Sequence, residues 1–199
     1  MPTALVVRAE SSVVARGGSV RVALTLIGAP LPATVEVLSA TGPSAAFDSF
    51  ATISTDDGRA SLLVTPASNT TYRFRYAGAF GIAAAQVDVR VLVRRSVALI
   101  GRSSTVVSTA KVGRSVTLVA VIGPAKAGVS VSFRLYRFDA ARRTWIYAGS
   151  RGRGTDASGR ASYAWVPASA GSWYWRASVA ATIDFANNMS PVYRWSVSR

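Results

Sequence analysis

The sequence has 199 residues, half of them hydrophobic, and 23 basic against 9 acidic side chains give it a formal net charge of +14. It contains neither cysteine nor histidine, which excludes disulfide bonds, thiolate metal sites and histidine-based acid–base catalysis. No apolar run approaches the roughly 18 residues of a membrane-spanning helix. We therefore expect a globular protein that does not insert into a membrane.

Alternation of apolar and polar residues predicts short strands along the whole chain. In chain order, the alternating segments are 20–26, 35–37, 72–76, 87–93, 116–122, 131–135, 173–179 and 193–197. Turn signals such as DDG, APLP, GPAKAG and DASG separate them, and no segment of ten or more residues has helical spacing. About seven short strands per roughly 100 residues predict an all-β sandwich architecture.

The chain repeats itself. TDDGRASLLVTPASNTTYRFRYAG begins at Thr55, and TDASGRASYAWVPASAGSWYWRASV begins at Thr155. Most positions of these phrases match at an offset of 101, whereas GGSVRVALTLIG and VGRSVTLVAVIG match at an offset of 96. The difference predicts a five-residue insertion around RFDAARRTW. A period near 100 indicates tandem domains, which we place at residues 1–94 and 95–199.

The repeated phrases resemble bacterial immunoglobulin-like repeats of secreted and surface proteins, of the type abundant in actinobacteria. The shared motifs are a Gly–x–Val strand start, an Asp–x–Gly turn, a proline and an aromatic–x–aromatic strand. The resemblance covers nearly the whole chain and implies two tandem immunoglobulin-like antiparallel β-sandwiches joined by a short linker. It places Tyr72 and Trp173 at the corner-tyrosine position, and Phe74 and Trp175 where antibody domains carry a cysteine.

The copies meet near residues 91–97, where VLVRRSV contains no glycine-, proline- or serine-rich tether. We expect the last strand of one domain to run almost directly into the next domain, which favours a semi-rigid rod. The resemblance implies an extracellular or cell-surface location, but the opening MPTALVVRAE has no signal-peptide pattern. Either the chain is a fragment or processed form of an exported protein, or it is not exported by that route.

The chemistry-bearing residues do not form a catalytic set. The serines lack a histidine base and a Gly-x-Ser-x-Gly elbow. Asp56 and Asp57 lie in a predicted turn, where aspartate is favoured by backbone hydrogen bonding, and we prefer this interpretation to catalysis or calcium binding. GRGTDASG lacks the lysine and context of a phosphate loop. We expect no enzymatic activity, no cofactor and no metal.

The copies differ in charge and aromatic content. Eight arginines against six acids give residues 1–94 a charge of +2, whereas fifteen basic residues against three acids give residues 95–199 a charge of +12. All five tryptophans, at positions 145, 165, 173, 175 and 195, also lie in the second copy. The second copy is therefore predicted to present a basic surface.

Strand alternation indicates which side chains form that surface. If Val131, Phe133 and Leu135 point inward, and Trp173, Trp175 and Trp195 do too, then Arg134, Tyr136, Tyr174, Arg176 and Arg194 point outward. The immunoglobulin-like topology that the resemblance implies makes the three strands neighbours, so one sheet face carries all five residues. The matching face of the first copy carries Arg73, Arg75 and Arg90 beside Glu36 and Asp88, which can neutralise it through cross-strand pairs. The basic face is either a solvated surface with arginine–tyrosine contacts or a binding site for an anion.

A second basic feature is RRTWIYAGSRGRG, in which Arg142, Arg143, Arg151 and Arg153 are predicted to cluster in or beside loops. Within it, Trp145 and Tyr147 either pack over the sheet edge or offer a platform for sugar stacking. Such clusters attract polyanions without sequence specificity, and no nucleic-acid-binding motif accompanies them, so we expect no specific nucleic-acid partner.

Three functions remain open. The first is a structural spacer that carries other domains of a larger protein. The second is an adhesive module that binds an anionic polysaccharide or cell-wall polymer through Arg134, Tyr136, Tyr174, Arg176, Arg194, Arg142, Arg143 and Trp145. The third is a self-assembling subunit of a virion or an extracellular filament, joined through free sheet edges.

Overall fold

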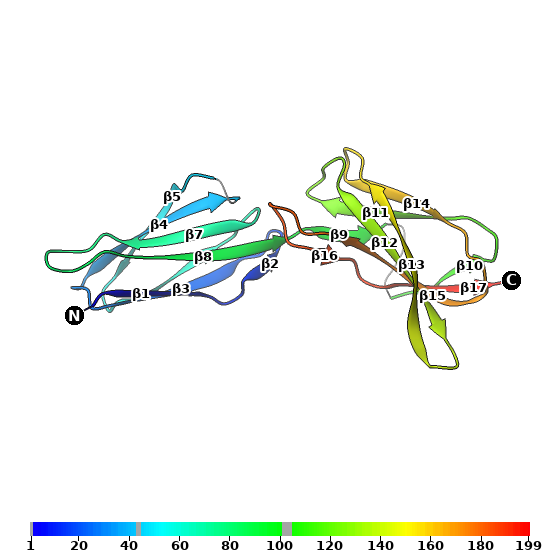
Figure 1. Cartoon of the computed structure of the whole chain (residues 1–199), viewed down its shortest axis with the longest axis horizontal. Helices are drawn as coiled ribbons and strands as arrows, with labels where there is room; N and C mark the ends of the chain where they lie inside the picture. The colour runs from blue at the N-terminus through cyan, green and yellow to red at the C-terminus, as the bar shows by residue number, and fades with distance from the viewer. Residues whose placement is uncertain (1, 43–44, 101–104) are drawn as a thin grey trace. The chain divides into compact units, whose positions relative to one another are not determined.

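The computed structural model describes residues 2–42, 45–100 and 105–199, and contains no helix within them. It divides into two compact units (Figure 1). The first unit consists of Met1–Arg94 and Thr182–Ala186, and the second consists of Arg95–Ala181 and Asn187–Arg199. Neither unit offers a helix that could cross a membrane in the described ranges.

The first unit contains two sheets. One has three strands in the order β1 (Ala4–Ala9), β3 (Val20–Ile27) and β6 (Arg59–Val64). The other has five strands in the order β2 (Val13–Ala15), β8 (Ala85–Arg94), β7 (Thr70–Tyr76), β4 (Ala33–Thr41) and β5 (Asp48–Thr55). Neighbouring strands are antiparallel except β2 and β8, which are parallel.

The second unit repeats this topology. Its three-stranded sheet has the order β14 (Arg160–Trp165), β11 (Val116–Gly123) and β9 (Ser96–Leu99). The larger sheet has the order β10 (Ser108–Lys111), β17 (Tyr193–Ser198), β15 (Gly171–Val179), β12 (Ser130–Asp139) and β13 (Thr144–Gly154), and β16 (Asn188–Met189) pairs with β15. The edge strand β10 is again parallel to its neighbour β17.

Each unit buries its own hydrophobic core between its two sheets. In the first unit, the alternating residues Val20, Val22, Leu24 and Leu26 of β3 pack with residues of the opposite sheet such as Phe74. In the second unit, tryptophans take much of this space. Trp165 contacts Trp173, Trp175 and Trp195 edge-on, with ring centroids 5.6–5.8 Å apart. Such pairs add about 0.5–1.5 kcal/mol beyond the burial of their area.

The sequence-based fold is confirmed: the chain is all-β, with two tandem immunoglobulin-like sandwiches of equivalent strand order. Only Arg95 separates β8 from β9. The parallel edge pairs β2–β8 and β10–β17 are features that alternation alone did not predict. At the corner position of the second unit, the Trp173 indole N–H donates to the Ser169 carbonyl at 3.3 Å, so a tryptophan also makes a bond to upstream backbone.

The first unit includes a short segment from far along the chain, residues 182–186. The Asn69 backbone N–H donates to the Asp184 carbonyl at 2.7 Å, and its side-chain amide donates to the Ile183 carbonyl at 3.0 Å. Phe185 is buried in the first core and 7% exposed. The predicted division at residue 94 did not anticipate this segment, because a lone phenylalanine within a loop carries no repeat signal.

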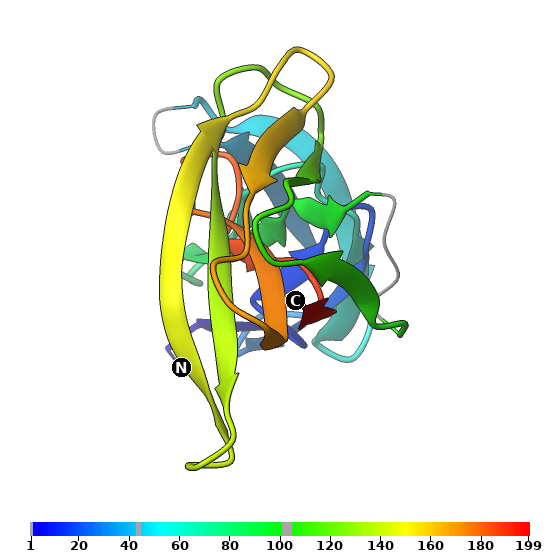
Figure 2. The same cartoon turned by 90° about the vertical axis from the view of Figure 1, so that its right-hand side faces the viewer.

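The registers also correct the predicted insertion. Val37 pairs with Phe74 in the first unit, and Leu135 pairs with Trp175 at the equivalent place in the second. Leu135 lies 98 residues after Val37, so the offset has already grown from 96 to 98 at this strand. Part of the five-residue difference therefore lies before β12 rather than around RFDAARRTW, because the β11–β12 connection is also longer. The β12–β13 hairpin extends beyond the neighbouring strands of the second unit (Figure 2).

Candidate functional site

The larger sheet of the second unit brings the predicted residues together. Strands β17, β15 and β12 are neighbours, as the immunoglobulin-like topology predicts. Trp173, Trp175 and Trp195 point into the core, with 7%, 1% and 1% exposure. We call the opposite side the outer face. Its side chains include Arg134, Tyr136, Phe138, Trp145, Tyr147, Tyr174, Arg176 and Arg194.

One end of the outer face is an aromatic cluster. The rings of Tyr136 and Tyr174 stack with centroids 4.5 Å apart and an interplanar angle of 18°. Trp145 meets Tyr174 edge-on at 4.7 Å, and Tyr147 meets Tyr136 edge-on at 5.4 Å. Phe138 lies against Trp145 at 5.3 Å. Because Tyr147 remains 55% exposed, the cluster presents an aromatic surface to solvent.

The sequence indicated Tyr136, Trp145 and Tyr174 as site residues and offered Tyr147 with Trp145 as a stacking platform, but Phe138 was missed. The signal for Phe138 was present. Phe138 follows Tyr136 by two residues, and Tyr147 follows Trp145 by two, so each pair shares a sheet face. What alternation could not show is that a register shift between Leu135 and Tyr136 sets Tyr147 opposite Tyr136.

The arginines lie beside the aromatic cluster. Arg134 is directly opposite Arg176, and Arg194 is directly opposite Tyr174. The Arg176 side chain donates through Nε to the Ser190 carbonyl at 3.1 Å, which fixes the base of its guanidinium. Within the described part of the chain, Arg134, Arg176 and Arg194 form no ion pair. Partial burial raises the pKa of the Tyr174 phenol above its ordinary value, and the nearby Tyr136 adds to that rise.

The same positions in the first unit are neutralised. Glu36 is directly opposite Arg75, and the two form an ion pair of 2.5 Å. Asp88 is opposite Arg73 and accepts two hydrogen bonds from it at 2.8 Å. The hydrogen bond from Arg73 holds the pKa of the Asp88 carboxyl below its ordinary value. Cross-strand pairs thus neutralise Arg73 and Arg75, as the sequence indicated, whereas Arg90, the third arginine of this face, lies opposite Thr71.

Superposing the two registers shows what has changed between the copies. Val37 corresponds to Leu135 and Phe74 to Trp175, so the ion pair Glu36–Arg75 corresponds to Arg134–Arg176. By the same register, the pair Arg73–Asp88 corresponds to Tyr174–Arg194. Arginines in the second unit therefore occupy the positions of both acids of the first unit.

Beyond the arginines lies a small polar hollow of about 260 Å³. Its lining consists of Ser130, Ser132, Arg134, Ser178, Val179, Ala180, Asn187, Asn188 and Met189. The Ser178 hydroxyl donates to the Ser132 carbonyl at 3.4 Å, and Asn188 donates to the Arg95 carbonyl at 2.6 Å. The outer face therefore changes along β12 from serine, through arginine, to tyrosine and phenylalanine.

The second predicted basic cluster does not form. Arg142 and Arg143 lie at the exposed tip of the β12–β13 hairpin, where Arg142 is 4.0 Å from Asp139. Arg151 and Arg153 are instead in β13, opposite Phe133 and Val131. They therefore lie on the inward side of the strand edge, and Arg153 is 5.3 Å from the Tyr163 ring centroid. The four arginines are therefore divided between the hairpin tip and the paired strand β13, because SRGRG belongs to a strand and not to a loop.

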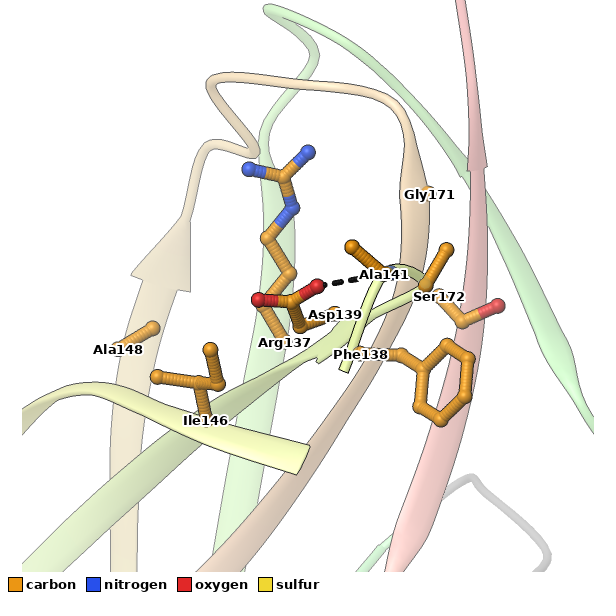
Figure 3. Close-up of a pocket in the computed structure, with 9 residues that line it drawn as sticks. Arg137, Phe138, Asp139, Ala141, Ile146, Ala148, Gly171 and Ser172 are labelled. Atoms are coloured by element: carbon orange, nitrogen blue, oxygen red, sulfur yellow. Dashed lines mark hydrogen bonds between the residues drawn. The ribbon is translucent and has the colours of Figure 1, made fainter. Parts of the chain in front are cut away.

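A larger hollow of about 740 Å³ lies beside the projecting hairpin (Figure 3). Arg137, Ile146 and Ala148 contribute to its lining, and Asp139 accepts a hydrogen bond from the Ala141 N–H at 2.9 Å. Arg137 is held by a contact of 5.4 Å with the Trp173 ring and a 3.5 Å bond to the Ala170 carbonyl. The acid and the base in this hollow therefore both have partners within the protein.

The turn aspartates act as the sequence predicted. Asp57 accepts a hydrogen bond from the Arg59 N–H at 2.9 Å, and Asp156 accepts from the N–H groups of Ser158 and Arg160, each at 2.9 Å. The bond from the Arg59 N–H lowers the pKa of the Asp57 carboxyl below its ordinary value. The pKa of the Asp156 carboxyl is lowered mainly by the Ser158 hydroxyl, which donates to it at 2.7 Å, and then by the backbone N–H groups. No group of three acidic side chains in the described ranges is arranged to hold a metal ion.

No protein-family model matches the sequence, and no curated protein matches it. Among solved structures, trypsin-activated alpha-2-macroglobulin from Escherichia coli is similar, with 12% identity and a TM-score of 0.40. The match covers all of this chain but only 17% of that protein.

Two solved structures of modular proteins are also similar. Fibronectin(III)-like modules of Clostridium thermocellum CbhA match over 97% of this chain and 94% of that one, with 15% identity and a TM-score of 0.31. A chimeric titin Z1Z2 tandem functionalised with a GRGDS peptide matches over all of both chains, with 20% identity and a TM-score of 0.36. The immunoglobulin-like assignment rests on the strand order and registers of the two units.

Proposed function

We propose that this chain is a non-catalytic tandem module of a secreted or cell-surface protein, of actinobacterial type, whose second unit binds an anionic glycan or cell-wall polymer. The observation that carries this proposal is the replacement of the ion pair Glu36–Arg75 by the arginine pair Arg134–Arg176. In the first unit the same two positions carry Glu36 and Arg75, which neutralise each other, so the fold does not require a net positive charge there. The basic face is therefore a property of the second unit alone.

Electrostatics supports a ligand at this face. Like charges directly opposite each other on neighbouring strands are destabilising, whereas opposite charges contribute about 0.2–1 kcal/mol. An anion placed between Arg134 and Arg176 would provide the partner that Glu36 provides in the first unit. Guanidinium groups bind carboxylates and phosphates through paired hydrogen bonds. The adjacent aromatic cluster adds an apolar surface suited to sugar rings.

The direct experiment compares binding of the whole chain to alginate, an anionic polysaccharide, and to neutral dextran at one ionic strength. We expect retention on alginate only. Replacing Arg134, Arg176 and Arg194 together by serine is expected to abolish that retention. If the triple variant binds alginate as strongly as the original chain, the outer face is not the binding site.

The matched control removes the same charge elsewhere. Arg114, Arg160 and Arg199 are exposed residues of the second unit outside the outer face. Changing these three to serine lowers the net charge equally, and should leave most of the binding intact. Equal loss in both triple variants would show that binding follows net charge rather than this face.

A second candidate function is that of a spacer. It is supported by the tandem repeat and by the single residue, Arg95, between β8 and β9. A spacer function alone predicts equal, negligible binding to alginate and dextran. It also predicts that another tandem pair of equal length can replace this one in the parent protein without loss of function.

A further inference from the structure

We propose that the ligand is a glycan containing hexuronic acid, with its carboxylate held between Arg134 and Arg176, and with sugar rings in the serine-lined hollow and against the aromatic cluster. This inference rests on the proposed function and specifies the ligand class. The inference is drawn from three different surfaces that follow one another along β12. Binding to a basic patch alone would not require the polar and aromatic surfaces on either side of the arginines.

The three surfaces are evenly spaced. Ser132, Arg134 and Tyr136 follow one another on the same face of β12, two residues apart. Successive side chains on one face of a strand are separated by roughly 7 Å. The arginine pair therefore has a polar hollow on one side and the aromatic cluster on the other. A ligand that uses all three must carry its anionic group between two groups of different chemistry.

The hollow is suited to hydroxyl groups. Serine hydroxyls both donate and accept hydrogen bonds, and asparagine side chains offer a carbonyl and an amide. Ser130, Ser132, Ser178 and Asn187 supply these groups in the hollow, with Arg134 at its border. Its volume of about 260 Å³ is at the small end of ligand sites, which suits part of a single sugar residue.

The aromatic cluster is suited to the apolar face of a second sugar. Tyr147 is its most exposed ring, at 55%, and it is held in place by Tyr136. Ring packing fixes these side chains before a ligand arrives, so little conformational entropy is lost on binding. An acidic sugar flanked by other pyranose rings satisfies the hollow, the arginine pair and the cluster together.

Other polyanions fit only part of this arrangement. Inorganic polyphosphate can pair with the arginines, but it has no ring for the aromatic cluster. Single-stranded nucleic acid can stack on aromatic rings and pair with arginines, but its bases do not supply the clustered hydroxyls that suit the serine hollow. Sulfated glycans share the sugar rings, but at the equivalent place in the first unit the partner of Arg75 is a carboxylate, that of Glu36.

The experiment is isothermal titration calorimetry of the whole chain with four oligomers at matched ionic strength and matched charge. The ligands are hexagalacturonate, a sulfated oligodextran, polyphosphate and oligothymidylate. We expect hexagalacturonate to bind at least about tenfold more tightly than each of the others, a difference of roughly 1.4 kcal/mol.

Two variants test the flanking surfaces. Tyr147→Ala and Ser132→Val should each weaken hexagalacturonate binding about three- to tenfold, or roughly 0.7–1.4 kcal/mol, and leave polyphosphate binding unchanged. Thermal unfolding of each variant verifies that the second unit is folded.

The outcomes separate the two proposals. If the sulfated dextran, polyphosphate or oligothymidylate binds as tightly as hexagalacturonate, the uronate assignment is wrong and the anion-binding face remains. If Tyr147→Ala and Ser132→Val weaken all ligands equally or none, the flanking surfaces are not subsites. If no anionic ligand binds, the proposed function fails as well.

Discussion

Arg134 lies directly opposite Arg176 on neighbouring strands, at the position where the first unit joins Glu36 to Arg75. A duplicated fold makes this difference informative because the two sites share strand order, register and the β-bulge next to the pair. The first unit therefore serves as an internal reference for what the scaffold alone requires. The first unit has an ion pair at this place, whereas the second unit has two adjacent arginines.

Salt dependence measures how many charges take part in binding. When binding releases counterions, the logarithm of the affinity falls linearly with the logarithm of the salt concentration. We expect Arg194→Ser to reduce that slope by roughly one, as for the loss of one ionic contact. Arg160→Ser, on the opposite sheet, should leave the slope unchanged. Titrations at several sodium chloride concentrations measure it, and identical slopes for all three proteins would contradict a local contact.

Phe185 is expected to stabilise the first unit, although it lies far along the chain. Phe185→Ala should lower the free energy of unfolding of that unit by roughly 3 kcal/mol, because it leaves a cavity in the first core. All five tryptophans belong to the second unit, so their fluorescence reports on that unit separately. Hydrogen exchange at the backbone amides of Val22 and Phe74, in the first core, reports on the stability of the first unit.

The neighbouring Ile183 is 56% exposed and provides the control. Ile183→Ala should change stability by no more than about 0.5 kcal/mol. Unchanged exchange at Val22 and Phe74 in the Phe185→Ala variant would show that residues 182–186 do not contribute to the first core.

The turn before β14 requires glycine at position 159. Gly159 has a φ of 74°, and an added Cβ would lie 2.7 Å from the Ile122 carbonyl oxygen. Gly159→Ala should therefore destabilise the second unit by roughly 1–3 kcal/mol. Gly113 has the same φ of 74°, but an added Cβ there would have no neighbouring heavy atom within 4 Å, so Gly113→Ala should cost only about 1 kcal/mol. Urea unfolding followed by tryptophan fluorescence distinguishes them; equal losses would mean that backbone strain alone sets the cost.

The first unit should lose stability in acid in a way that depends on Asp88. Its hydrogen bond from Arg73 lowers the folded-state pKa, whereas an unfolded aspartate titrates at about 3.9. The stability that the ionised Asp88 carboxylate contributes to the first unit is thus fully present above about pH 3.9, and it is lost as the pH falls through the lowered pKa. Asp88→Asn should flatten the fall in first-unit stability between about pH 5 and 2. Hydrogen exchange across this range measures it, and an unaltered pH profile would contradict the assignment.

Much of this structure could be predicted from local patterns. Alternation placed Trp173 and Trp175 inside and Arg134 and Arg176 outside, because the period of a strand is two residues. Register, in contrast, depends on backbone pairing between distant segments. The opposition of Arg134 to Arg176, the separation of Arg151 from Arg142, and the docking of Phe185 all follow from such pairings, and they could not be read from alternation.

The substitution Arg134→Glu tests the central claim most directly. It gives Arg176 the partner that Arg75 has in Glu36, so the second unit should stay folded and gain up to about 1 kcal/mol of stability. We predict that the variant keeps or raises its thermal unfolding midpoint and loses at least about tenfold in affinity for hexagalacturonate, a difference of roughly 1.4 kcal/mol. An equally stable variant that binds this ligand as tightly as the original chain would contradict the account.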